Sequence, residues 1–516
     1  MTITRTPLFF GPGLFGWYHA PVEQQRELAA VICQPLGHEY INAHRSMRHL
    51  ADRLARAGIP ALRFDYHGTG DSAGTDEDSG RVAAWRDSVS EAIKTVRELS
   101  GSPRIALVGF RFGATLAAQF ESDALVLWAP VMRGKSYARE LKALRLTSGT
   151  MGGFEYTEET QRDIAALSID KPEAVTIWPD PHGESAYAEM LAPPHNTKVP
   201  FETIDEIVHQ LTVASSRLPL GSTAPRQPAT GNRQLIDGLR ESILPGRTFG
   251  IVTEPATGAK PAPTILLPNA GSAHHVGPGR LYVLLARALA RQGFRVIRLD
   301  LPGLGDSVVE DASRENHPYE PPATPVLAEL MPALGHDSYI VAGLCSGAHA
   351  AFHAARELPV VESILINPLT FYYEPGMSLD TGPSTNQYSE WQRYLQLARS
   401  GEGWRKVLHG NVGVANVLST VVARFSRRGR RNANLADDLR RIAGSGRRLT
   451  FLFSRLDSGY DLLMLSAGPE VKRLQKQGRL DLWRIEGANH TFDAKEAREA
   501  MIARLIEHLA GRYLSS

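Results

Sequence analysis

The stretch YIVAGLCSGAHAAFHAA, residues 339–355, decides the fold because it joins an apolar run, a sharp turn and a helical segment. The run YIVAGL has the composition of a buried strand, and the small residues after the turn favour a helix. Two glycines flank Cys345 and permit a strained bend that lifts its side chain clear of the backbone. The pattern therefore predicts that Cys345 is displayed as a nucleophile, the alternative being a buried core cysteine.

The chain repeats itself at an offset of 235 residues. LADRLARAGIPALRFD begins at Leu50 and LARALARQGFRVIRLD begins at Leu285, and each continues into a similar turn, GTGDS or GLGDS. Each copy has a helical pattern, a glycine and a β-branched strand, which is an αβ unit. The counterpart of GLCSG is GFRFG, residues 109–113, whose central Arg111 cannot act as a nucleophile. The repeat predicts two tandem domains.

Strand-like runs alternate with helical segments in both halves. We expect strands at AAVICQP, PALRFDY, IALVGF, ALVLWAP and AVTIWPD, and in the second half at PTILLPN, RVIRLDL, YIVAGLC, ESILINP, LTFLFSR and LDLWRIE. This alternation predicts an α/β fold with two mostly parallel sheets. The Pro, Gly, Ser and Thr content of LPLGSTAPRQPATGNR indicates a linker. We therefore expect a silent domain over residues 1–217, a linker over 218–240, and an active domain over 241–516 with a helical lid at about 378–448.

Two polar residues follow later strands of the second half in the order expected of a catalytic triad. Asp457 comes after LTFLFS, and His490 comes after LDLWRIE. The carboxyl ends of parallel strands share one edge of a sheet, where the turn at Cys345 also lies. His490 should take and return a proton while Asp457 orients its ring. Asp461 is the rival acid, although its place at the start of a helix also suits a cap.

Acyl transfer also needs two backbone N–H groups aimed at the developing oxyanion. Ser346, directly after the nucleophile, supplies one by the geometry of the turn. The other should come from the loop in TILLPNAGSAHH, where Ala270 and Gly271 are both candidates. His274 and His275 follow, but adjacent side chains point in different directions, so a metal site is not expected there. Neither a metal nor an organic cofactor is implied.

The first half lacks a comparable set of residues. Arg111 replaces the nucleophile, and His195 holds only roughly the place of a catalytic histidine. A cation at a helix N-terminus opposes the helix dipole, so Arg111 should pair with an acid such as Asp65 or Asp71, or bind a phosphate-like anion. We interpret this half as catalytically silent.

At these residues the chain resembles the α/β-hydrolase superfamily, and within it the serine-aminopeptidase-like hydrolases, including those associated with exosortase systems. The resemblance runs through RFDYHGTGDSAG and GFRFG in one half and through RLDLPGLGDS, GLCSGAHAAF, INPLTFYYEPGMSLD and GANHTF in the other. It implies the fold but not peptidase activity, because fold does not fix function. Similar members with cysteine at this turn include carrier-protein aminoacyl shuttles, polyester synthases and dienelactone hydrolases. The resemblance thus implies an acyl-enzyme thioester, a good acyl donor.

Composition narrows the classes of partner. The 516 residues carry 57 Lys and Arg against 55 Asp and Glu, a formal net charge of +2, which favours neither nucleic acid nor an anionic membrane. The apolar N-terminal stretch is broken too early for a signal peptide, and no later run is long enough to span a membrane. Two widely separated cysteines fit a reducing, cytoplasmic setting.

One basic patch lies within the expected lid. It consists of Arg424, Arg427, Arg428, Arg430 and Arg431. Charge runs are usually solvated loops. The functional alternative is docking of an acidic acyl or peptidyl carrier protein, or of its phosphopantetheine phosphate.

Three functions follow from these residues. The leading hypothesis is a cysteine-dependent acyltransferase or thioesterase acting on carrier-protein or coenzyme A thioesters in a biosynthetic pathway. The second is hydrolysis of small esters or lactones by the same triad. The third is a non-catalytic pseudohydrolase scaffold, against which the complete Cys, Asp and His set argues.

Overall fold

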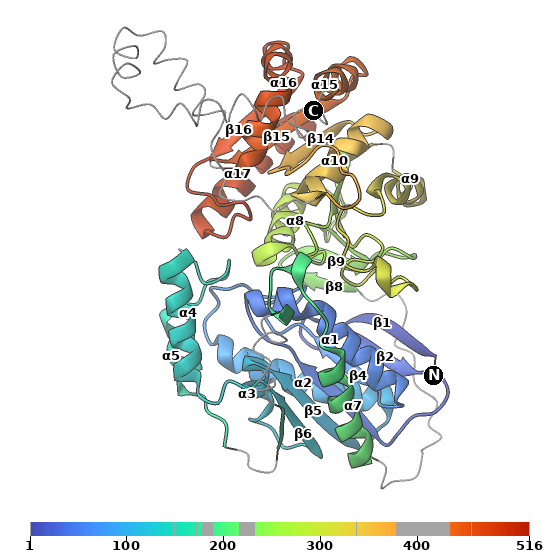
Figure 1. Ribbon diagram of the computed structural model, residues 1–516, viewed down its shortest axis with the longest axis vertical. Coiled ribbons are helices and arrows are strands. Elements are labelled where there is room, and N and C mark those ends of the chain that lie inside the picture. Colours follow the sequence, from blue (N-terminus) through green and yellow to red (C-terminus); the bar gives the residue numbers. More distant parts are fainter. Residues whose placement is uncertain are drawn as a thin grey trace.

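The computed structural model describes residues 2–148, 150–170, 174–177, 189–215, 233–336, 338–377, 434–455 and 457–514. These residues form two α/β lobes, one built from the chain up to residue 215 and the other from residue 233 onward (Figure 1). Each lobe is built on its own β-sheet.

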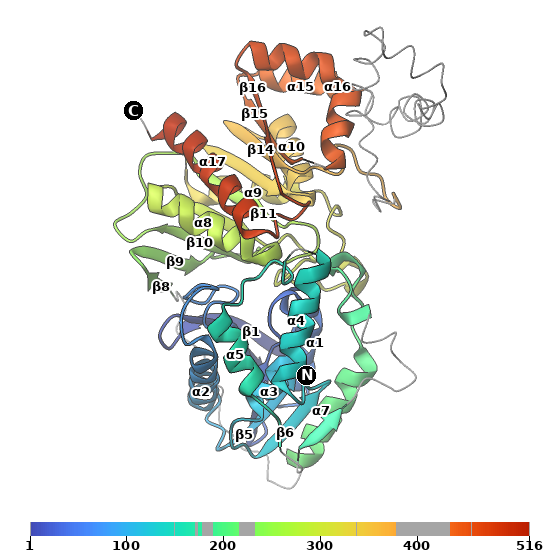
Figure 2. The same cartoon turned by 90° about the vertical axis from the view of Figure 1, so that its left-hand side faces the viewer.

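The first lobe has a sheet with the order β1-β2-β4-β3-β5-β6-β7. Its strands are β1 (Ile3–Phe10), β2 (Leu14–Pro21), β3 (Leu28–Cys33), β4 (Ala61–Phe64), β5 (Arg104–Phe110), β6 (Ala124–Trp128) and β7 (Val175–Ile177). β2 pairs antiparallel with β1 and with β4, and the other neighbours are parallel. Its helices are α1 (His38–Arg56), α2 (Arg81–Ser100), α3 (Phe112–Ala117), α4 (Gly134–Ser148), α5 (Glu158–Ala166), η1 (Pro194–Asn196) and α7 (Phe201–Ser215). Figure 2 shows α2 and α7 on opposite sides of this sheet.

The second lobe has a sheet with the order β16-β15-β14-β13-β11-β12-β10-β9-β8. Its strands are β8 (Arg233–Ile236), β9 (Leu239–Ile243), β10 (Gly250–Pro255), β11 (Thr264–Pro268), β12 (Val296–Leu299), β13 (Tyr339–Leu344), β14 (Glu362–Ile366), β15 (Arg448–Ser454) and β16 (Leu480–Ile485). Its helices are η2 (Pro278–Arg280), α8 (Leu281–Gln292), η3 (Ala312–Arg314), α9 (Ala323–Leu334), α10 (Ser346–Glu357), α15 (Leu435–Gly444), α16 (Ser458–Lys476) and α17 (Lys495–Tyr513). No helix in the described ranges is both long enough and apolar enough to cross a membrane.

The two sheets share one topology. β3, β4, β5 and β6 hold the same positions in the first sheet as β11, β12, β13 and β14 hold in the second, and all of these are joined in parallel. The predicted α/β fold with mostly parallel sheets is confirmed. The antiparallel strands β1, β2, β8, β9 and β10 were not predicted, because their sequences mix polar residues, Gly and Pro with apolar ones.

The expected linker and lid lie partly outside the described residues. The described part of the linker contains β8 and the start of β9, which extend the second sheet. The five arginines of the basic patch and most of the expected lid, residues 378–433, fall outside the described ranges. The end of the expected lid forms α15, and its Leu435, Leu439 and Ile442 join the main apolar core of the lobe.

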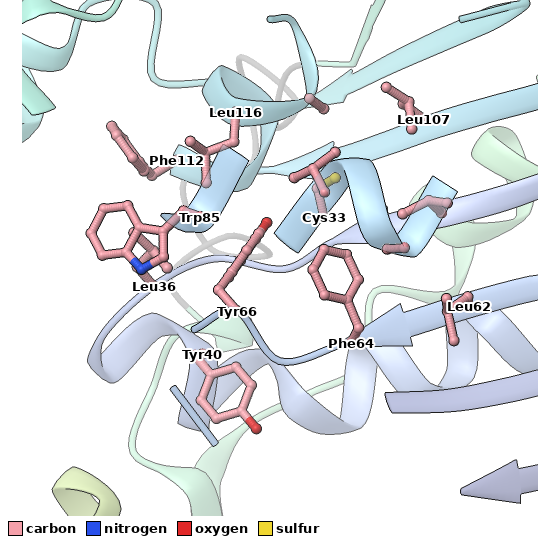
Figure 3. Packing of buried hydrophobic residues seen from close by; sticks show 14 of the residues in the cluster. Cys33, Leu36, Tyr40, Leu62, Phe64, Tyr66, Trp85, Leu107, Phe112 and Leu116 are labelled. Atoms are coloured by element: carbon pink, nitrogen blue, oxygen red, sulfur yellow. The ribbon is translucent and has the colours of Figure 1, made fainter. Parts of the chain in front are cut away.

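The apolar core of the first lobe contains the first of the two cysteines. Figure 3 shows Cys33 among Phe64, Tyr66 and Phe112, with Trp85 nearby. Cys33 is fully buried, and burial raises the pKa of its thiol to about 12. This thiol therefore stays protonated and inert, as expected of a core cysteine.

The lobes contact each other through their matching turns, GTGDS and GLGDS. Arg63 of the first lobe pairs with Asp306 of the second, and Arg298 of the second pairs with Asp71 of the first. All four side chains are buried. Arg63 matches Arg298 in the repeat and Asp71 matches Asp306, so the two ion pairs are reciprocal. The same exchange of equivalent contacts is found at the interface of a two-fold symmetric dimer.

Candidate active site

Cys345 lies on a strained turn between β13 and α10. Its φ of 60° and ψ of −113° are rare for a residue other than glycine. Glycines are needed on both sides: a Cβ on Gly343 would approach a backbone carbon of Gly347 to 2.4 Å, and a Cβ on Gly347 would approach the Pro268 oxygen to 2.9 Å. The Cys345 N–H donates to the carbonyl of Ile366 at 3.0 Å, which ties the turn to β14. The cysteine is partly exposed.

Asp457 and His490 are joined by a hydrogen bond at the same edge of the sheet. Asp457 caps the N-terminus of α16, where its Oδ1 accepts from the Gly459 N–H at 2.9 Å. Its Oδ2 accepts from Nδ1 of His490 at 2.6 Å. The carboxylate is buried, so both bonds hold it in one orientation. Because Asp457 takes the Nδ1 position of the ring, the rival Asp461 does not hold that place.

The other ring nitrogen of His490 is available for chemistry. Nε2 is buried and has no hydrogen-bond partner among the described residues. Burial opposes a charge on the ring, but the bond to Asp457 and the neighbouring Cys345 raise the pKa of His490 to about 10. The Cys345 thiol is close enough to His490 to raise its pKa, although no hydrogen bond of ordinary geometry joins Sγ to Nε2. Such contacts often tighten only when a substrate binds.

The loop that carries His490 is anchored by Asn367, directly after β14. Its Nδ2 donates to the backbone carbonyl of His490 at 2.8 Å, and its Oδ1 accepts from the Ser454 N–H at 2.8 Å. Asn367 itself has a φ of 44°, a conformation that asparagine tolerates better than most residues. One side chain therefore connects the ends of β14 and β15 to the histidine loop.

The loop after β11, residues 269–275, is called the oxyanion loop below because it carries Ala270 and Gly271. The Gly271 N–H donates to Oγ of Ser346 at 2.9 Å, and that hydroxyl donates to the Asn269 carbonyl at 3.2 Å. The Gly271 amide is thus in use, whereas the Ala270 N–H makes no hydrogen bond within the described part of the chain. The Ser346 N–H lies in the first turn of α10, where amides lack helical acceptors. This geometry favours the pair of Ser346 and Ala270.

Three rings in contact with one another, which the sequence patterns did not predict, form a cluster that reaches the thiol through Tyr319. The Tyr319 hydroxyl is 3.8 Å from Sγ of Cys345, and its ring stacks on Tyr373 with centroids 5.0 Å apart. His349, one turn along α10 from Cys345, meets Tyr319 edge-on at 5.2 Å. Burial lowers the pKa of His349 to about 3, so this ring is neutral. Helical spacing alone would have found His349, but Tyr319 lies in an irregular loop that carries no pattern.

Arg111 occupies the matching turn of the first lobe and is paired with carboxylates. Its Nε donates to Glu39 at 2.7 Å and its Nη2 donates to Glu140 at 2.6 Å. We predicted an acidic partner for Arg111 such as Asp65 or Asp71. In the structure the acidic partners are Glu39 and Glu140 instead. Glu39 lies in the first turn of α1, close to the turn in space but far from it in sequence.

His274 and His275 face different groups. Nε2 of His274 lies 3.2 Å from the Tyr40 hydroxyl, whereas His275 is bonded at Nδ1 by Asp300 at 2.8 Å and at Nε2 by Asp71 at 2.6 Å. Ligand-type atoms of His275 and two aspartates do gather within 4.8 Å of one another. Both ring nitrogens of His275 already engage carboxylates, however, so neither offers a lone pair to a metal.

Two family profiles match this sequence. The profile described as "Alpha/beta hydrolase family" matches residues 264–504, and the one described as "Serine aminopeptidase, S33" matches residues 31–176. The two matches therefore fall on the second and first lobes respectively. A search of curated proteins found no match.

Several solved structures are similar to about half of the chain. Carboxyl esterase 2 of the fungus Tuber melanosporum is 17% identical and covers 53% of this chain and 88% of its own, with a TM-score of 0.32. An esterase of Pyrobaculum calidifontis is 20% identical and covers 54% and 87%, with a TM-score of 0.31. The thioesterase domain from the curacin biosynthetic pathway is 17% identical and covers 52% and 99%, with a TM-score of 0.30.

Proposed function

The chain belongs to the α/β-hydrolase superfamily, and from this premise we propose that its second lobe is a cysteine-dependent acyl-transfer enzyme with Cys345 as nucleophile. The observation that carries the proposal is the meeting of three side chains from distant parts of the sequence. A partly exposed thiol on a strained turn lies beside an imidazole whose Nδ1 is held by Asp457. A nucleophile, a base and a residue that orients the base are the parts that covalent acyl transfer needs.

The first step is acylation of the thiol. Sγ of Cys345 attacks the carbonyl carbon of the acyl donor, its proton goes to Nε2 of His490, and the carbonyl oxygen becomes an oxyanion. The N–H groups of Ser346 and Ala270 stabilise that oxyanion. As the intermediate collapses, the bond to the leaving group breaks and His490 returns the proton to it. Asp457 holds the ring throughout and stabilises its charged form.

The second step transfers the acyl group onward. His490 removes a proton from the acceptor, which attacks the thioester carbonyl carbon. The bond between that carbon and Sγ of Cys345 then breaks, and His490 gives the proton to Sγ. Thioesters of coenzyme A or of a carrier protein suit the first step because the attacking and leaving atoms are both sulfur, so the exchange is close to balanced. The acceptor is a hydroxyl, an amine, a thiol or water, and with water the net reaction is thioester hydrolysis.

The first lobe supplies no nucleophile in this proposal. Arg111 stands at the matching turn with its guanidinium paired to Glu39 and Glu140. A guanidinium stays protonated at any physiological pH and cannot attack a carbonyl. We therefore include in the proposal that the lobe of residues 1–217 is catalytically silent.

Intact-protein mass spectrometry tests the proposal directly. The protein is incubated with a panel of acyl-coenzyme A and acyl carrier protein thioesters, and with small esters and lactones. A mass increase equal to the acyl group is expected in the wild type and in Cys33→Ala, and none in Cys345→Ala. The Cys33→Ala variant is the matched control because it removes the only other thiol.

Two outcomes would contradict the proposal. An adduct that persists in Cys345→Ala would place the reaction elsewhere. Loading by no member of the panel, with Cys345 also unreactive toward iodoacetamide near pH 7, would leave the second lobe without a reactive thiol. Loading by free esters in preference to thioesters would instead favour hydrolysis of small esters.

A further inference from the structure

A carboxylate of the silent lobe contacts the oxyanion loop of the other lobe. The ring of His275 closes that loop and lies between two aspartates. Asp300, in the same lobe, is 2.8 Å from Nδ1, and Asp71, in the first lobe, is 2.6 Å from Nε2. The side chains of all three residues are at most 1% exposed. Buried charges persist only when they are paired in this way.

Asp300 connects His275 to the beginning of the oxyanion loop. Its Oδ1 accepts from the backbone N–H of His275 and from Nδ2 of Asn269, both at 2.7 Å. Nδ2 of Asn269 also donates to the Ala273 carbonyl at 2.9 Å. The two ends of the loop are therefore fixed to one carboxylate, and Ala270 lies between them. Any movement of the His275 ring is passed to the segment that carries the free Ala270 N–H.

Asp71 is itself held in place by the second lobe. Its carboxylate pairs with the buried guanidinium of Arg298. Arg280 holds the turn around Asp71, because its guanidinium donates to the carbonyls of Gly70 and Gly74 at 2.8 and 2.7 Å. Asp71 is thus a rigid part of the site's surroundings although it belongs to the other half of the chain.

We propose that Asp71 is a positioning residue for the reaction at Cys345: the silent lobe supplies the carboxylate that fixes His275 and, through it, the oxyanion loop. The inference rests on the proposed function, because it assumes that an oxyanion forms beside Ala270. The proposal gives the first lobe a role in the reaction although Arg111 stands where a nucleophile would be.

Among the described residues, no carboxylate of the second lobe hydrogen-bonds to Tyr40, which matches His275, and this asymmetry supports a functional role for Asp71. Tyr40 matches His275 in the repeat, but its hydroxyl donates to Asp65 of its own lobe at 2.7 Å. Asp306, which matches Asp71, pairs with Arg63 and lies 3.3 Å from Nε2 of His44, which is in α1 and does not match His275. The lobes therefore exchange ion pairs symmetrically, but only the second lobe receives a carboxylate onto the ring that closes its loop.

The charge on His275 should report on the contact between its ring and Asp71. The groups that face the ring are Asp71, Asp300, Asp306 and His274, with Arg298 behind Asp71. Burial opposes a charge on the ring, but Asp71 and Asp300 together raise the pKa of His275 to about 10. Loss of the Asp71 charge should lower the pKa of His275 towards neutrality. The ring would then lose its charge as the pH rises through that lower value, which weakens its interaction with Asp300 and so its hold on the loop.

The test compares Asp71→Asn with the control Glu315→Gln, which removes a different ion pair between the lobes, that of Glu315 with Arg48. Two reactions are measured: turnover of the best acyl thioester, and alkylation of Cys345 by iodoacetamide, which forms no oxyanion. In Asp71→Asn we expect kcat to fall about 10- to 100-fold, the size typical of partners that orient a catalytic group, with KM and the alkylation rate unchanged. Its kcat should also decline with rising pH between about 6 and 9, unlike that of the wild type. Glu315→Gln should keep both rates within about threefold.

Several outcomes would overturn the inference. An unchanged kcat in Asp71→Asn would show that the loop is fixed without the first lobe. A parallel fall of kcat and alkylation rate would indicate general loss of structure. If Asp71→Asn does not fold, His275→Gln breaks the same link from the loop side and must show the same selective loss of kcat. A wild type that loads no acyl group would refute the proposed function itself, and the inference with it.

Discussion

The turns at Arg111 and Cys345 have almost the same backbone and opposite chemistry. Their φ and ψ angles are 54° and −125° at Arg111, and 60° and −113° at Cys345. Each turn residue donates its N–H to the strand that follows, Arg111 to Trp128 and Cys345 to Ile366, both at 3.0 Å. The strained conformation therefore belongs to the fold and persists where no nucleophile is present. Strain at a turn indicates how a side chain is displayed, and the neighbours decide what it does.

The neighbours of the two turns differ accordingly. Two glutamates surround Arg111 and neutralise it, whereas Cys345 lies beside His490 and Asp457. Each of the following variants changes one side of this comparison.

Replacement of the nucleophile should have the largest effect. Cys345→Ala is expected to reduce kcat for thioester turnover on the order of 10⁶-fold, as seen when a triad nucleophile is removed. The measurement is single-turnover loading combined with steady-state kinetics. Residual turnover within about tenfold of the wild type would mean that Cys345 is not the attacking group.

Removal of the orienting carboxylate should have the next largest effect. Asp457→Asn keeps the size of the side chain but no longer holds the His490 tautomer, and kcat should fall about 10⁴-fold. The alkylation rate of Cys345 should fall as well, because the imidazole no longer assists removal of the thiol proton. Asp461→Asn is the matched control on the same helix, and an equal loss in that variant would contradict the assignment of the acid.

The pH dependence of thermal stability should show the interaction between Asp457 and His490. The pKa of His490 is raised from about 6.5 to about 10, so the protonated ring binds better to the folded protein. This stabilisation is complete below about pH 6.5 and is lost as the pH rises through 10. The Tm difference between wild type and Asp457→Asn should therefore be greatest near pH 6 and shrink towards pH 10. A difference that stays constant with pH would contradict the raised pKa.

The smallest catalytic effect is expected at the turn that carries Arg111. Arg111→Cys places a thiol on the strained backbone of the first lobe, beside Glu39 and Glu140 and without the Asp457–His490 pair that accompanies Cys345. We expect no second acyl adduct by mass spectrometry. The free energy of unfolding should fall by about 3 kcal/mol, because the buried Glu39 carboxylate is left without its partner. Acylation at position 111 would show that reactivity at such a turn does not require a histidine held by an aspartate.

Local patterns were sufficient to predict the parallel strands and the strained turns. Strands such as β11 and β13 are continuous apolar runs because both faces of a parallel sheet are covered. The order of Cys345, Asp457 and His490 along the chain placed all three after strands that end at the same edge of the sheet.

The remaining features depend on contacts that no local pattern encodes. The choice of Ala270 over Gly271 as the second oxyanion donor depends on the Ser346 hydroxyl, which accepts a hydrogen bond from the Gly271 N–H. The partners of Arg111 come from α1 and α4, and Tyr319 reaches the thiol from an irregular loop. Only the packing of the two lobes brings Asp71 next to His275, because 204 residues separate them in the sequence.

The reciprocal ion pairs between the lobes restrict how this protein can evolve. Arg63, Asp71, Arg298 and Asp306 are all shielded from water, and each has its counter-charge on the opposite half. A fragment containing either half alone would present uncompensated charges on what is now an internal surface, and should be poorly soluble or unstable by itself. Gene fission or exchange with an unrelated module would therefore fail unless both halves changed together. Purifying selection on the first half should accordingly be strongest at its inward-facing charges.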